Sequence, residues 1–197
     1  MPFSRFARSV FQFLAAVVVF AVSPALPAQD ATFRSNSAHS GVSSAPGVPE
    51  FHKLKWQFHT KAAIYSSPII SGDTVYIGSN DHNFYALDLV TGNVKWKFET
   101  GSHVQGSAAV SNGSVFFESY DSNFYCLDSA TGKLKWKFKT EGERRFAAKH
   151  LHGAEPASET MPDPFDFYLS SPVVANGTVY FGSGDTNIYA LDAASGT

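Results

Sequence analysis

Four side chains able to bind a ligand stand close together in the stretch RRFAAKHLHG, residues 144–153. Arg144 and Arg145 carry guanidinium groups, which hold a carboxylate or phosphate through two parallel hydrogen bonds. His150 and His152 are two residues apart, so on an extended segment both imidazoles point the same way and would suit zinc or copper. No third metal ligand is evident, and nearby glutamates offer the arginines local ion pairs, so the alternative is an ordinary polar loop. We take all four as ligand-binding candidates and assign no metal site.

Composition and net charge limit the classes of partner that the chain could bind. The chain has 197 residues, of which 44% are hydrophobic and 16% charged, as expected for a folded, soluble domain. Its 15 basic and 17 acidic residues give a net charge of -2, which favours neither nucleic acid nor an anionic membrane as a partner. No Ser-His-Asp order, phosphate loop or carboxylate pair can be defended, so we assign no catalytic residue.

The first 28 residues have the form of a signal peptide. Arg5 and Arg8 precede an apolar run over residues 13–22, and LPA, ending at Ala28, is a cleavage candidate. The run is too short to cross a bilayer as a stable helix, so we expect export to the periplasm or beyond, with no stable membrane anchor after cleavage. The alternative is an uncleaved anchor.

Residues 29–52 are rich in Ser, Ala, Gly and Pro, which indicates a linker or lead-in, and we expect order to begin near Lys53. Cys126 is the only cysteine of the chain. It excludes an intramolecular disulfide and a C-x-x-C-H haem site, and we expect it to be buried.

From Lys53 onward the sequence repeats itself. Trp56, Trp96 and Trp136 are each 40 residues apart, and residues 54–93 align with 94–133 at 16 identities without a gap. The repeats run over 53–92, 93–132 and 133–197. The third repeat carries 24 extra residues, because its SSPVV motif at 170–174 matches SSPII at 66–70 only after an insertion at about 141–168. The four candidates of residues 144–153 lie inside this insertion.

Each repeat has the pattern of four short strands. In the first repeat we expect strands over 67–71, 74–79, 83–88 and 94–100. The fourth strand alternates apolar and lysine positions, whereas the middle strands are apolar on both faces, as expected for sheets covered on both sides. Small antiparallel sheets repeated in this way predict an all-β fold, a β-propeller of four-stranded blades.

Polar residues recur between the strands. Asp88 opens the turn DLVTG, and its counterparts open DSATG and DAASG, with glycine where a positive φ is needed. Asp81-x-Asn83 and its two counterparts form a second set between the middle strands. We interpret both sets as turn formers; calcium ligands are the alternative for the second.

The stretches ALDLVTGNVKW, residues 86–96, and CLDSATGKLKW, residues 126–136, resemble the tryptophan-docking motif of the pyrroloquinoline-quinone (PQQ) repeat, A-x-D-x-x-T-G-x-x-x-W. The resemblance covers residues 53–197. It implies that Trp96 and Trp136 pack between adjacent blades and that Cys126 replaces a small, packed alanine. FRSNSAHSGV, residues 33–42, also resembles the lead-in of bacterial members.

About three blades are visible, and we expect them to be a fragment of a ring of seven or eight. The chain opens with a lone outer-type strand over 53–60 and stops three residues short of the next tryptophan position. In closed propellers such a first strand commonly completes the last blade.

The resemblance implies two kinds of activity. Quinoprotein dehydrogenases of this superfamily bind PQQ with calcium and usually carry a vicinal cysteine pair, but no residue here can be matched to those ligands. The other branch is non-catalytic and includes the outer-membrane protein assembly factor. We therefore expect no cofactor and predict an exported, non-catalytic PQQ-like propeller acting as a binding or assembly scaffold. The alternatives are a fragment of a PQQ-dependent dehydrogenase and a ligand-sensing propeller domain of a larger protein.

Strand direction places the insertion at the same face as the turns 79–83, 119–123 and 183–187, where propellers of the family usually bind. We expect a protein partner or small ligand there. Glu118 is a further candidate, because it stands in a middle strand where the other repeats have Gly78 and Gly182, and a carboxylate there must be paired or hydrated. We expect it to face the central channel, with His103 as a neighbour.

Overall fold

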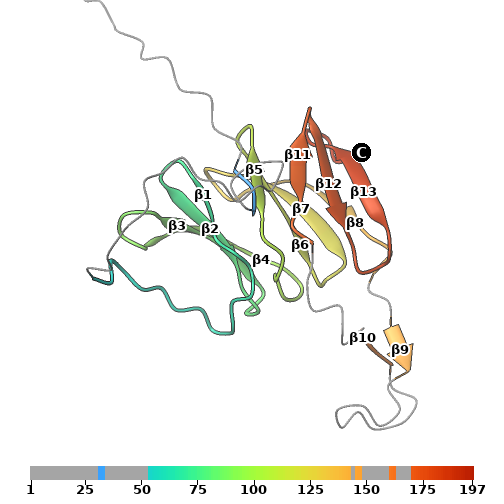
Figure 1. The fold of residues 1–197 in the computed structure, drawn as a ribbon, viewed down its shortest axis with the longest axis horizontal. Helices are drawn as coiled ribbons and strands as arrows, with labels where there is room; N and C mark the ends of the chain where they lie inside the picture. Colours follow the sequence, from blue (N-terminus) through green and yellow to red (C-terminus); the bar gives the residue numbers. More distant parts are fainter. Residues whose placement is uncertain (1–30, 34–52, 143–144, 148–159, 163–169) are drawn as a thin grey trace, which may run out of the picture.

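Three antiparallel sheets lie side by side in the computed structural model, which describes residues 31–33, 53–142, 145–147, 160–162 and 170–197 (Figure 1). The first sheet consists of β1 (Ile69–Ser71), β2 (Thr74–Gly78), β3 (Asn83–Asp88) and β4 (Val94–Glu99). The second consists of β5 (Ala109–Ser111), β6 (Ser114–Ser119), β7 (Asn123–Asp128) and β8 (Leu134–Lys139), and the third of β11 (Val173–Ala175), β12 (Thr178–Gly182) and β13 (Ile188–Asp192). The predicted all-β architecture is confirmed as a partial β-propeller.

Within each sheet the strands follow one another in chain order, so each sheet is a meander. The hairpins between the first two strands turn at Gly72, Asn112 and Asn176, all of which have positive φ values. Glycine and asparagine adopt this conformation most readily, and they let a two-residue loop join adjacent strands.

Within the described ranges, no helix is long and apolar enough to cross a membrane.

Stacked phenylalanines fill the space between neighbouring sheets. Phe84 of β3 stacks on Phe117 of β6 at a centroid distance of 4.0 Å, and Phe124 of β7 stacks on Phe181 of β12 at 3.8 Å. Cys126 lies in this second contact with no exposed surface, as the sequence predicts, and burial raises the pKa of its thiol to about 11. The thiol therefore stays protonated and unreactive at neutral pH.

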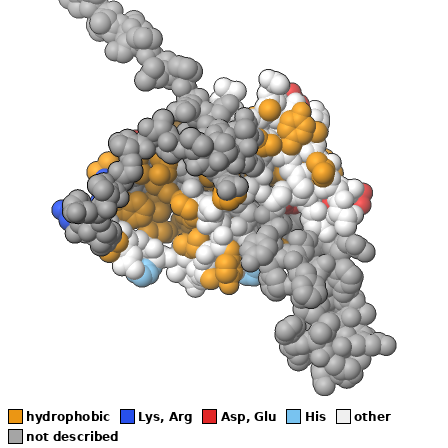
Figure 2. Space-filling view, in the orientation of Figure 1, with side chains coloured by type: hydrophobic (Ala, Val, Ile, Leu, Met, Phe, Trp, Pro, Cys, Tyr) orange, Lys and Arg blue, Asp and Glu red, His pale blue; other side chains and the backbone are white. Residues whose placement is uncertain are grey.

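The second sheet is the most buried because it has a neighbour on each side. All six residues of β6 are buried, whereas in the third sheet Ile188 of β13 is 85% exposed. Figure 2 shows hydrophobic side chains at the surface over the first and the third sheets. Most exposed apolar strand positions fall on the sheets that have one neighbour, and Leu134 of β8 is the exception in the second sheet.

Each repeat's tryptophan reaches the turn that precedes the fourth strand of the adjoining repeat. The indole Nε1 of Trp96 on β4 donates to the carbonyl oxygen of Ser129 at 3.0 Å, and Trp136 on β8 donates to Ala193 at 3.2 Å. A Cβ built on Gly132 would stand 2.6 Å from Trp96 Cδ2, so the indole lies directly against the glycine of that turn. The contact joins the second sheet to the first and requires both the indole and the bare backbone.

Two segments differ from the sequence-based expectation. Residues 53–60 form no strand, since no neighbouring strand pairs with them, although Trp56 Nε1 still donates to Leu89 O at 3.0 Å. Order also begins earlier than Lys53: Ala31 pairs with Val110 of β5 through two backbone hydrogen bonds of 2.8 and 2.6 Å. Thr32, 7% exposed, donates from Oγ1 to Pro172 O at 3.3 Å.

The insertion contains a two-stranded antiparallel hairpin that the sequence pattern did not predict. Strand β9 (Arg145–Ala147) pairs with β10 (Thr160–Pro162), with Phe146 opposite Met161. In Figure 1 this hairpin stands apart from the three sheets.

A matched pair of glycine substitutions measures the indole contact. Gly132 and Gly113 both have φ of +70°, but Gly132 lies against Trp96 and a Cβ at Gly113 has nothing within 4 Å. We expect Gly113→Ala to cost about 1 kcal/mol of unfolding free energy from backbone strain, and Gly132→Ala roughly 1–3 kcal/mol more from overpacking. Urea denaturation followed by far-UV circular dichroism measures both. Equal losses in the two variants would show that the indole contact contributes nothing.

Candidate functional site

At the insertion-bearing end of the sheets, each turn between the two middle strands is organised by one aspartate. Asp81 Oδ1 accepts from its own turn at Asn83 N (3.1 Å), and Oδ2 accepts from the hydroxyl of Tyr85 (2.7 Å) and from Lys61 N (3.0 Å). Lys61 belongs to the segment that enters the first sheet, so the carboxylate ties that segment to the turn. The same three bonds recur at Asp121, with Asn123, Tyr125 and Gly101, and at Asp185, with Asn187, Tyr189 and Glu141.

These carboxylates have the turn role that the sequence predicts. Burial raises the pKa of Asp81, but the hydrogen bonds from Tyr85 and from the backbone of Lys61 and Asn83 outweigh it, so the pKa lies below its ordinary value. The balance is the same at Asp185. Burial and the bond to Asp81 in turn raise the pKa of Tyr85. In the part of the chain that the structure describes, no group of three or more His, Cys, Asp or Glu side chains could hold a metal ion.

The lowered carboxylate pKa values predict an acid-sensitive fold. A carboxylate whose pKa is lower in the folded than in the unfolded state stabilises the fold above the unfolded value, and this contribution is lost as pH falls through the folded pKa. Replacing Asp81 or Asp185 by Asn should therefore flatten the fall in unfolding free energy between pH 5 and pH 3, each by about 1 kcal/mol or less given partial exposure. Urea titrations at several pH values measure this, with Glu99→Gln as the exposed control. An unchanged acid limb in both aspartate variants would contradict the assignment.

Glu118 lies on β6 with only 2% of its surface exposed. In the first sheet, Ser66 Oγ donates to Gly78 O at 2.9 Å and accepts from Gly78 N at 3.0 Å, and Ser170 makes the same pair of bonds with Gly182 in the third sheet. At the matching positions of the second repeat the sequence has Gly106 and Glu118. Both members of the serine–glycine pair differ in the second repeat, where a glutamate replaces the glycine and a glycine replaces the serine.

This exchange predicts energetic coupling. Glu118→Gly alone leaves a gap, and Gly106→Ser alone crowds Glu118, but the double variant restores the serine–glycine pair of the other two sheets. We expect the double variant to be more stable than the sum of the single changes by about 1 kcal/mol or more. A double-mutant cycle in urea provides the measurement, and strictly additive single changes would exclude the coupling.

His103 is exposed at the entry to the second sheet, where its Nδ1 donates to the carbonyl oxygen of Asn80 at 2.7 Å. Its ring packs edge-on against His82 at a centroid distance of 5.0 Å and stands 6.5 Å from Tyr120. The structure thus brings His103 together with His82, on the turn of the first sheet, while Glu118 is buried in the second.

Among the insertion's candidates, Arg145 opens strand β9. Arg144, His150 and His152 lie outside the described residues. Glu141, at the start of the insertion, donates its backbone N–H to Asp185 Oδ2 at 2.9 Å, so the insertion begins at the end of the sheets that the strand directions predict.

Sequence reasoning missed the tyrosine of each turn and the second role of its aspartate. The signal was present, because Tyr85, Tyr125 and Tyr189 each follow the turn aspartate by four residues. The alternation of a strand carries residues two apart to the same side, so Asp, Asn and Tyr at this spacing converge.

The meander sheets, the interleaved phenylalanines and the tryptophan-to-turn contacts define a β-propeller built from PQQ-like repeats. A family model described as outer membrane protein assembly factor BamB matches residues 96–197, more than half of the chain, and the chain therefore belongs to this family of PQQ-like repeat proteins. No curated protein matches the chain.

Solved structures give the same fold. BamB from Moraxella catarrhalis superposes with a TM-score of 0.55 at 22% identity, over 74% of this chain and 39% of that protein. A europium-containing methanol dehydrogenase gives 0.53 at 26% identity, over 74% and 26%. The computationally designed Ika4 protein gives 0.55 at 15% identity, over 75% and 77%. The chain thus spans well under half the length of the two natural proteins.

Proposed function

We propose that the chain forms part of an exported, non-catalytic propeller that serves as a binding or assembly scaffold in the periplasm or outside the cell. One observation carries the proposal: the aspartates that recur in the turns of all three sheets are engaged in holding the turns and the neighbouring chain segments. The two oxygens of Asp81, for example, accept from the turn, from Tyr85 and from the entering segment. Residues used in this way in all three repeats support architecture rather than chemistry.

Four of the candidate polar residues belong to the insertion, which occurs once. It begins beside Asp185, at the end of the sheets that carries the aspartate turn of each repeat. The family model's description as an assembly factor supports a protein as its partner. The arginine and histidine candidates Arg144, Arg145, His150 and His152 are the side chains that would give this contact its specificity.

A quinoprotein dehydrogenase is the second candidate, favoured by the likeness to the europium-containing methanol dehydrogenase. Calcium beside PQQ requires six to eight oxygen ligands. Within the described ranges no such cluster forms, and the carboxylates of Asp81, Asp121 and Asp185 are engaged with turn and tyrosine donors. These carboxylates therefore give the dehydrogenase proposal no support, and we derive no reaction step from the cofactor.

Site-specific photo-cross-linking in cells tests the scaffold proposal. A benzoylphenylalanine at Met161 of β10, in the full-length protein, should give a discrete protein adduct in the exported fraction. The same group at Val90, an exposed position at the opposite end of the first sheet, is the matched control and should give none. Equal adducts from both positions would remove the insertion as the partner surface. Stoichiometric PQQ binding with alcohol-dependent dye reduction would replace the scaffold by the dehydrogenase.

A further inference from the structure

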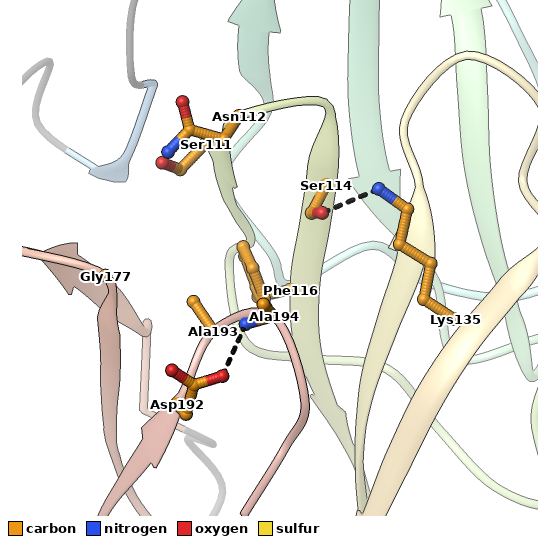
Figure 3. A pocket seen from close by; sticks show the side chains of 9 residues that line it. All are labelled: Ser111, Asn112, Ser114, Phe116, Lys135, Gly177, Asp192, Ala193 and Ala194. Atoms are coloured by element: carbon orange, nitrogen blue, oxygen red, sulfur yellow. Dashed lines mark hydrogen bonds between the residues drawn. The ribbon is translucent and has the colours of Figure 1, made fainter.

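A cavity of about 340 Å³ lies between the second and third sheets, at the end opposite the insertion. Ser111, Asn112, Phe116 and Lys135 line it from the second sheet, and Ala193 lines it from the third (Figure 3). Its volume is within the range of small-ligand sites. The repeat alone does not explain this cavity, because different residues stand at the matching place between the first and second sheets.

In that first groove, a tyrosine reaches across from one sheet to the other. The hydroxyl of Tyr76 donates to Ser129 O at 3.0 Å. At the matching positions of the second groove stand Phe116 and Ala193, so both the tyrosine hydroxyl and the serine hydroxyl are absent. The second groove therefore has two apolar side chains where the first has two that carry hydroxyls.

The lysine of each groove shows the more important difference. Lys95 Nζ lies 2.6 Å from Asp73 Oδ1 in the first groove. Lys95 Nζ also donates to Asp73 O at 3.2 Å and to Thr74 Oγ1 at 2.8 Å. The residue that matches Asp73 in the second repeat is Gly113, so Lys135 Nζ keeps the two equivalent bonds, to Gly113 O and Ser114 Oγ at 2.8 Å, and lacks the carboxylate. Its nearest carboxylate is Asp128 Oδ2 at 3.8 Å, beyond hydrogen-bond length. An ammonium group has three donors, so Lys135 retains one for a further acceptor.

We propose that this cavity binds a small carboxylate ligand with a short apolar body. The ligand's carboxylate takes the place on Lys135 that the Asp73 side chain has on Lys95. Its apolar part packs against Ala193 and Ala194, because Phe116, which also lines the pocket, is only 1% exposed. The amide of Asn112, where the first repeat has Gly72, supplies a second donor at the rim.

The acidic neighbours of the cavity do not oppose this assignment. Asp192 lines it, but its Oδ1 already accepts from Ala194 N at 3.1 Å and Ser195 N at 2.8 Å. In the first groove Asp128 occupies the position that matches Asp192, and Asp88 lies 4.0 Å from Lys95, yet the Asp73 carboxylate still sits on that lysine. The fold thus accepts one further carboxylate at this place.

Benzoate and its neutral analogue benzamide are the probes. Calorimetric or NMR titration of the whole chain should show saturable binding of benzoate, with benzamide about tenfold weaker, because a charge-assisted hydrogen bond is lost. Benzamide binding as tightly as benzoate, or an absence of saturable benzoate binding, would overturn the proposal.

Three variants and one control locate the site. Lys135→Gln should weaken benzoate about tenfold, whereas Lys95→Gln, the matched lysine of the first groove, should leave it unchanged. The double change Asn112→Gly with Gly113→Asp installs the Gly72–Asp73 turn of the first sheet and should block the cavity with its own carboxylate. Phe116→Tyr should reduce binding by filling the missing hydroxyl position. Retention of full affinity in Lys135→Gln would sink the assignment whether or not the turn exchange folds.

Discussion

The contact between an indole and a bare glycine backbone is the interaction on which the arrangement of sheets depends. No strand of one sheet pairs with a strand of the next, so the ladders by themselves set no spacing between sheets. Trp96 supplies that spacing, because its ring covers Gly132 while its N–H bonds to Ser129. A side chain on the glycine would push the sheets apart, and a smaller residue than tryptophan would leave the turn carbonyl unmet. Aromatic stacking at Phe84 and Phe117 then fills the space that this contact defines.

A second set of ties acts at the other end of the sheets. Asp81, Asp121 and Asp185 each bond the backbone of the segment that enters their own sheet. Gly101 and Glu141 directly follow the outer strands β4 and β8, so Asp121 and Asp185 each hold the chain where it leaves the preceding sheet. At one end the sheets are held by tryptophan side chains that contact the neighbouring sheet, and at the other by aspartates that bond to the backbone of the connecting segments.

The sequence predicts the repeated architecture well, because its signals are local and periodic. The spacing of Trp56, Trp96 and Trp136 and the alternation in the fourth strands require only chain geometry, and the burial of Cys126 follows from them. The features that the sequence did not predict depend on contacts between distant segments. Residues 53–60 have the pattern of a strand but no partner, and Ala31 gains order from Val110, far along the chain. Pairing between distant segments has no period, so a pattern read along the chain does not contain it.

The candidate site was harder to predict for a related reason. What sets the repeats apart is a small number of paired exchanges, Ser66 with Gly78 against Gly106 with Glu118, and Asp73 against Gly113. Each exchange is visible in an alignment of the repeats, but its meaning depends on which strands face each other. The structure supplies this for Ser66 and Gly78, which are hydrogen-bonded, and for Asp73, which forms an ion pair with Lys95.

The placement of Ala31–Phe33 also bears on the order in which the molecule can assemble. Thr32 bonds to Pro172, 140 residues later in the chain, and Ala31 lies against a strand of the second sheet. Because synthesis starts at the amino terminus, residues 31–33 are made early, although the residues that they contact are made much later. The contacts with Val110 and Pro172 need the second and third repeats in place, so these amino-terminal residues reach their native contacts only after much later parts of the chain are available.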